Sequence, residues 1–129
     1  MDETRKILLM DDDDCIIKVV GLMLTSLGNE VVVSMNGSEA ITMYKEALNT
    51  CKPFDVVIMD LTIPGDMGGE EAIIHLLEID PNVKAIVTSG YSNDPVLLNF
   101  KDHGFRGYIS KPYKLDELQH ILNEVMNEK

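Results

Sequence analysis

Short apolar runs alternate along this chain with longer segments whose apolar residues recur at helical spacing. The runs at 7–10, 31–33, 54–59, 83–89 and 105–110 are the length of strands and predict five of them. The segments 15–27, 38–48, 70–78, 95–103 and 115–126 carry apolar residues three and four positions apart, which predicts five helices. Because every strand is followed by a helix, the pattern predicts an α/β fold, a parallel sheet covered by helices on both faces.

Turn-forming residues separate these elements. Gly28 follows the first predicted helix and Gly104 the fourth, where each suits a helix end. The segment 63–69 holds one proline and three glycines, so it predicts a loop after the third strand. No repeat, low-complexity tract or linker interrupts the alternation. We therefore expect one domain that spans residues 1–129.

The charge of the chain narrows its partners. It has 129 residues, with 11 Lys and Arg against 22 Asp and Glu, and a formal net charge of -11. Such an excess repels phosphate backbones and anionic lipids, so we expect no direct binding to nucleic acid or membrane. Neither a signal peptide nor an apolar stretch of membrane-spanning length is present, and Cys15 and Cys51 stand far apart without a Cys-x-x-Cys pattern. These features predict a cytoplasmic protein.

Reactive side chains follow the predicted strands, at the edge where open parallel sheets bind ligands. Asp11 and Asp12 follow the first strand, Asp60 ends the third and Lys111 follows the fifth. Carboxylates brought together there would repel one another, by about 4 kcal/mol per pair at 4 Å and an effective dielectric near 20. Either their pKa values rise, or Lys111 and a divalent ion neutralise the cluster.

The type of ligand atom indicates which ion would bind. Sites built from oxygen ligands favour Mg²⁺, with Mn²⁺ as the alternative, over zinc. Magnesium commonly completes its shell with phosphate oxygens, and aspartate is able to carry a phosphoryl group covalently. The hydroxyls of Thr88 and Ser89, at the end of the fourth strand, suit a phosphoryl group as well. The sequence therefore predicts a magnesium-dependent phosphoryl site.

Several motifs resemble the receiver domains of two-component response regulators and hybrid sensor histidine kinases, over nearly the whole chain. The matching segments are 7–13, 36–40, 57–65 with Gly68-Gly69, Ser89-Gly90-Tyr91 and Lys111-Pro112. The resemblance implies a doubly wound, flavodoxin-like (βα)5 sheet with strand order 2-1-3-4-5. It also implies a two-component phosphorelay protein that catalyses only its own phosphorylation and dephosphorylation.

The same resemblance implies a role for each residue of the acidic site. Asp60 matches the phosphoacceptor, Asp12 a direct metal ligand and Asp11 a ligand acting through water. The backbone carbonyl of Thr62 would complete the protein's share of the metal shell. Lys111 would contact the acceptor and the phosphoryl oxygens.

The switch residues implied by the resemblance lie on the fourth and fifth strands. Ser89 is favoured as the switch hydroxyl because it lies 22 positions before Lys111, and Thr88 is the alternative. Tyr108 matches the switch aromatic residue, although taken alone it also fits a half-buried strand residue. The Lys111–Pro112 peptide bond is expected to be cis.

The implied partners are a phosphohistidine donor and a second copy. The donor would be a histidine kinase or a histidine phosphotransfer domain, and the homodimer would use the face of the fourth helix, fifth strand and fifth helix. The first helix is apolar on more than one side, so Cys15, Ile16 and Val19 would dock on the donor; burial under neighbouring segments is the alternative. A stand-alone regulator and a piece of a hybrid kinase both remain open.

Three other functions compete with a signalling receiver. A magnesium phosphohydrolase would want an acid–base carboxylate two residues after Asp60, where Thr62 stands. A flavin-binding electron carrier would need a phosphate-cradling loop after the first strand, where the acidic run lies instead. A degenerate receiver that only binds partners is disfavoured because no required group is missing.

Overall fold

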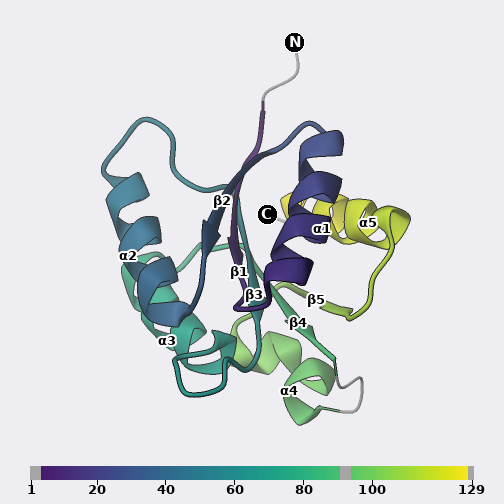
Figure 1. Cartoon of the computed structure of the whole chain (residues 1–129). Helices are drawn as coiled ribbons and strands as arrows, with labels where there is room; N and C mark the ends of the chain where they lie inside the picture. The colour runs from purple at the N-terminus through teal and green to yellow at the C-terminus, as the bar shows by residue number, and fades with distance from the viewer. Residues whose placement is uncertain (1–3, 91–93, 128–129) are drawn as a thin grey trace.

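The computed structural model describes residues 4–90 and 94–127, and its centre is a parallel five-stranded sheet (Figure 1). Its strands are β1 (Lys6–Met10), β2 (Glu30–Ser34), β3 (Val56–Asp60), β4 (Ala85–Ser89) and β5 (Gly107–Ser110). They lie in the order β2-β1-β3-β4-β5, and each neighbouring pair is parallel. The predicted fold class and strand order are confirmed.

Helices cover both faces of this sheet. They are α1 (Asp14–Ser26), α2 (Gly37–Leu48), α3 (Gly69–Ile79), α4 (Pro95–Leu98), a 3₁₀ helix (Phe100–His103) and α5 (Leu115–Met126). One face carries α1 and α5, and the other carries α2 and α3 with α4 near the carboxyl ends of the strands (Figure 1). Within the described residues, no helix combines the length and the apolar content that crossing a bilayer requires.

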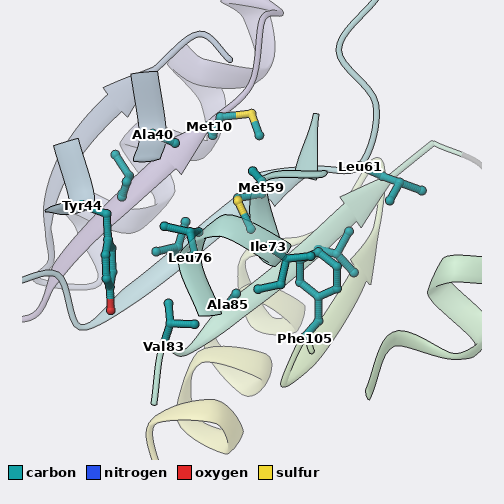
Figure 2. Packing of buried hydrophobic residues seen from close by; sticks show 14 of the residues in the cluster. Met10, Ala40, Tyr44, Met59, Leu61, Ile73, Leu76, Val83, Ala85 and Phe105 are labelled. Atoms are coloured by element: carbon teal, nitrogen blue, oxygen red, sulfur yellow. The ribbon is translucent and has the colours of Figure 1, made fainter. Parts of the chain in front are cut away.

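The three central strands β1, β3 and β4 are mostly apolar because both of their faces are buried, whereas the edge strands β2 and β5 are partly exposed. On β1, Leu8 and Met10 pack toward α2 and α3, whereas Ile7 and Leu9 pack toward α1 and α5. Figure 2 shows the first of these two cores, which also encloses Phe105. Two cores on opposite faces hold the sheet rigid, so the side chains at its carboxyl edge have a fixed support.

Short polar side chains begin the helices beside that edge. The Asp13 carboxylate accepts hydrogen bonds from the amides of Cys15 and Ile16, at 2.9 and 3.3 Å, and so caps α1. Asp13 is therefore the residue that starts α1, and its amide donates to Asp11 Oδ1 at 2.9 Å. The Asn36 side chain caps α2 in the same way, by accepting from the Glu39 amide.

The prediction of one helix over 95–103 was wrong. Asn99 has a non-helical backbone (φ -121°, ψ 38°) and divides the segment into α4 and the 3₁₀ helix. Gly104 then ends the segment in the left-handed conformation, with φ 98°. β3, β4 and β5 each begin two residues later than predicted, because the residues before them form loop contacts; the Phe105 amide, for example, donates to the Phe100 carbonyl.

Candidate functional site

Three charged side chains from distant segments meet at the carboxyl edge of the sheet. Lys111 Nζ lies 2.8 Å from Asp11 Oδ2 and 3.1 Å from Asp60 Oδ2. Asp11 follows β1, Asp60 is the last residue of β3 and Lys111 follows β5. The ammonium group therefore bridges two carboxylates in the centre of the site.

The alternation of side chains along the strands explains this meeting. Asp11, Asp60 and Lys111 each stand two positions after a core residue on the α1 and α5 side, namely Leu9, Ile58 and Ile109. Successive residues of a strand point to opposite faces, so residues two apart share a face. All three charged side chains are consequently directed to the same side of the sheet edge.

Asp12 completes an acidic trio with Asp11 and Asp60. One carboxylate oxygen from each lies within 4.8 Å of the others. Asp11 is buried and Asp12 is exposed, while Asp60 has an intermediate exposure. The set offers only oxygen ligands and one solvent-facing side, which suits a hard ion that keeps water in its shell, such as Mg²⁺. The residues present therefore fit the predicted magnesium site.

Burial and charge shift the proton affinities of the site. Burial raises the pKa of the Asp60 carboxyl above its usual value; the Lys111 ammonium opposes this rise, and the Asp11 charge adds to it. Burial alone would lower the pKa of Lys111, but the hydrogen bond to Asp11 and the charges of Asp60 and Asp11 raise it overall. Lys111 is therefore held as a cation beside Asp60.

The two candidate switch hydroxyls occupy opposite faces of the sheet. Thr88 pairs with Asp60 across β3 and β4, and Ser89 is the next residue, with its side chain directed to the other face. Val87 lies two positions before Ser89 and therefore shares its face of the sheet. Val87 also pairs in register with Tyr108, so Ser89 and Tyr108 lie on the same face. Both hydroxyl residues are buried. Tyr91, the third residue of the Ser-Gly-Tyr motif, lies outside the described residues.

Tyr108 and the cis peptide lie on either side of Ser110. The Tyr108 side chain is 44% exposed, and its ring centroid lies 5.2 Å from that of Phe100. The peptide bond between Lys111 and Pro112 is cis, as the resemblance implied.

The loop after β3 is held against the site by close backbone contacts. The Thr62 amide hydrogen-bonds to the Asp60 carboxylate, and the Gly37 amide of α2 donates to the Met67 carbonyl at 2.7 Å. Gly68 lies so close to Leu61 that a Cβ there would overlap the Leu61 carbonyl oxygen. The glycine at this position is explained by that approach.

Sequence reasoning missed Tyr113, which lies beside the site. Its side chain is buried in the core under α1 and α5. Burial raises its pKa, and the charges of Asp11 and Asp60 add to the rise. Tyr113 could have been predicted to lie near the site because it stands only two residues after Lys111 in the sequence.

A doubly wound parallel sheet, with three carboxylates and a lysine at its carboxyl edge, defines the receiver class of signalling domains. The model of the response regulator receiver domain matches residues 7–123. The chain is 34% identical to the chemotaxis protein CheY of Thermotoga maritima, over 94% of this chain and 97% of that protein. It is 28% identical to the rice two-component response regulator ORR21, of which it spans 17%.

Solved structures agree with these sequence relatives. The receiver domain of a sensor histidine kinase from Pseudomonas aeruginosa superposes with a TM-score of 0.84 and 25% identity, and the match covers 98% of this chain and 100% of that one. That structure has a magnesium ion coordinated in its active-site cleft. The chain belongs to the response regulator receiver domain family.

Proposed function

We propose that this receiver accepts a phosphoryl group from a partner's phosphohistidine onto Asp60, with Mg²⁺ bound beside it. The observation that carries the proposal is the position of Lys111, within hydrogen-bond distance of both the Asp11 and Asp60 carboxylates. The Lys111 ammonium lies against the Asp60 carboxylate, and Asp11 and Asp12 lie beside it. This arrangement suits a carboxylate that receives a phosphoryl group, because the negative charge that the group brings is neutralised by the cation.

The transfer moves the phosphoryl group from nitrogen to oxygen. An Asp60 carboxylate oxygen attacks the phosphorus, a P–O bond forms, and the P–N bond to the donor histidine breaks. Lys111 neutralises charge on the acceptor and on the phosphoryl oxygens, and Ser89 donates a hydrogen bond to one of those oxygens. Water later hydrolyses the acyl phosphate and resets Asp60.

The metal would be held by Asp60, Asp12, Asp11 through water and the Thr62 carbonyl. When bound, Mg²⁺ supplies positive charge that the single ammonium of Lys111 cannot provide against three carboxylates. Mn²⁺ prefers similar oxygen ligands and is expected to substitute.

The exposed part of α1 is the proposed docking site for the donor. Val19 is 51% exposed and Cys15 is exposed as well. Ile16 is partly buried against the core under α1, so it would offer less surface to a partner than Cys15 and Val19. Leu22, at 67% exposed, adds apolar surface to the same helix.

The switch would connect the site to the face of α4, β5 and α5. Ser89 and Tyr108 share one side of the sheet, which favours Ser89 as the hydroxyl that moves together with Tyr108. Thr88 lies in register with Asp60 and is the alternative. Leu98 and Tyr108 are 70% and 44% exposed on this face, so it is the proposed surface for a homodimer or a downstream partner.

Small-molecule phosphorylation tests the chemistry without a partner. The protein is incubated with acetyl phosphate and Mg²⁺, and intact mass is recorded for the wild type, Asp60→Asn and Asp66→Asn. Asp66 is an exposed acid in the same loop and serves as the matched control. We expect one phosphoryl group on the wild type and on Asp66→Asn, and none on Asp60→Asn. An unlabelled wild type would favour a degenerate receiver instead.

The docking proposal needs a separate test. Val19→Glu should be labelled by acetyl phosphate like the wild type, because Val19 is not part of the acidic site. Transfer from a phosphorylated histidine phosphotransfer domain should be at least roughly tenfold slower, since the charge enters an apolar contact. Equal transfer rates for the two proteins would remove α1 from the donor interface.

A further inference from the structure

A second surface lies beside the phosphoacceptor loop, on the side of α3. It is a groove of about 410 Å³ between the loop after β3 and the first two turns of α3. Its lining consists of Leu61, Thr62, Ile63, Asp66, Gly68, Glu70, Glu71 and Ile74. We name it the α3 groove. It holds none of the three residues of the acidic trio.

The α3 groove combines apolar side chains with acidic ones. Leu61 and Ile63 are buried beneath it, whereas Ile74 is 59% exposed although it is a large apolar residue. Asp66, Glu70 and Glu71 contribute three carboxylates, and the described lining includes no Lys, Arg or His. The carboxylate of Glu71 does lie 3.8 Å from His75, a weak, solvent-exposed contact that requires a protonated histidine.

The loop wall of the groove is held in place by backbone contacts. The Asp66 amide donates to the Ile63 carbonyl at 3.0 Å, and the Glu70 amide donates to the Leu61 carbonyl at 3.4 Å. Gly68 is pressed against Leu61, as described above. A surface fixed in this way loses little conformational freedom when a partner binds, which favours recognition by a preformed site.

We propose that the α3 groove binds a protein segment that presents arginine next to a large aliphatic side chain. The aliphatic side chain would pack on Ile74, and the stem of the arginine would lie over the apolar floor. The guanidinium would face the carboxylates of Glu70 and Asp66, since its planar donors match carboxylate oxygens better than an ammonium does. Neither contact involves the phosphoacceptor, so the inference stands independently of the proposed function.

Charge complementarity selects this occupant over others. The chain carries a formal net charge of -11, so an acidic segment, a nucleic acid or an anionic lipid would be repelled. A purely apolar segment would desolvate three carboxylates without compensating them. A segment with both an aliphatic and a cationic side chain satisfies both parts of the lining.

The test uses a synthetic peptide with a neutral twin. The probe is Ac-Leu-Arg-Arg-Leu-NH₂, and in its twin each arginine is replaced by citrulline, which keeps the shape and removes the charge. Both are titrated into the ¹⁵N-labelled full chain, and amide shifts are followed by NMR. We expect the arginine peptide to shift amides within 61–74 preferentially and the citrulline peptide to bind more weakly.

Variants separate the groove from the general acidity of the chain. The double variant Asp66→Asn/Glu70→Gln should weaken peptide binding roughly fivefold, as expected for the loss of two exposed charge pairs. Ile74→Ser should weaken it through lost apolar contact. Glu46→Gln/Glu124→Gln, which removes the same charge from exposed positions on α2 and α5, should change it less than roughly twofold.

The outcomes that overturn the inference are specific. Shifts spread over all acidic surfaces, or equal losses in both double variants, would mean nonspecific attraction. Equal affinity for the arginine and citrulline peptides would exclude the charge contacts, and no shift at all would exclude the site. Because acetyl phosphate labelling of Asp60 is read separately, none of these results depends on whether the proposed function holds.

Discussion

The substitution Asp60→Asn is expected to stabilise the fold while it removes the phosphoacceptor. Asp60 carries a charge that the rest of the structure does not favour, because burial raises its pKa more than Lys111 lowers it. Asparagine keeps the shape of the side chain and removes this charge. Stability and function should therefore change in opposite directions at this position.

The distances give the size of the effect. The attraction between Lys111 Nζ and Asp60 Oδ2, 3.1 Å apart, amounts to about 5 kcal/mol at an effective dielectric near 20. Asp11 lies within 4.8 Å of Asp60 and repels it by about 3.5 kcal/mol under the same conditions, and the solvent-exposed Asp12 adds about 1 kcal/mol. These charge interactions nearly cancel, so the cost of burying the carboxylate decides the sign.

We expect Asp60→Asn to raise the free energy of unfolding by about 1–2 kcal/mol without divalent ions. This is a fraction of the several kcal/mol needed to bury an ion fully, because Asp60 is only partly buried. Urea unfolding in chelator near neutral pH measures this difference. Adding Mg²⁺ should stabilise the wild type, by about 2.7 kcal/mol at one hundred times its dissociation constant, and the variant much less. The gap between the two proteins should therefore narrow or reverse.

Asp66→Asn serves as the control, because Asp66 is exposed on the same loop and outside the acidic trio. It should change stability by less than about 0.5 kcal/mol and leave the response to Mg²⁺ intact. A lower stability of Asp60→Asn in chelator would mean that the buried charge of Asp60 stabilises the fold. Equal stabilisation of wild type and Asp60→Asn by Mg²⁺ would refute the metal assignment.

Three further predictions concern backbone space and ionisation. Gly68→Ala should cost roughly 1–3 kcal/mol, because its Cβ would overlap the Leu61 carbonyl; a wild-type urea midpoint would contradict this. Gly21→Ala, in α1 where a Cβ meets nothing within 4 Å, should instead stabilise by about 0.5–1 kcal/mol, and a loss of stability there would show that the helix position is constrained. Burial and the 2.7 Å hydrogen bond to Asp80 raise the pKa of Tyr44 in the folded chain. The neutral Tyr44 side chain therefore stabilises the fold fully below the unfolded tyrosine pKa of about 10, and this contribution is lost as the pH rises above that value. Tyr44→Phe should flatten this alkaline loss by up to about 1.4 kcal/mol per pH unit in pH-dependent unfolding, and an unchanged slope would exclude Tyr44 as its source.

The fold class and the residues of the acidic site could be predicted from the amino-acid pattern. Continuous apolar runs require strands buried on both faces, and the intervening helices require parallel crossovers, so the sheet followed from local patterns. Asp11, Asp60 and Lys111 were identified because parallel strands bring their carboxyl ends to one edge. Those inferences depend only on periodicity and strand direction, which a sequence encodes locally.

Features that depend on contacts between distant segments could be seen only in the folded chain. The break at Asn99, the exposure of Leu22 and the partial burial of Ile16 follow from how each segment packs against the rest of the chain. The α3 groove arises where Gly68 meets Leu61 across the loop, which no spacing rule shows. The raised pKa of Asp60 has the same origin, since burial and the distances to Lys111 and Asp11 exist only in the folded chain.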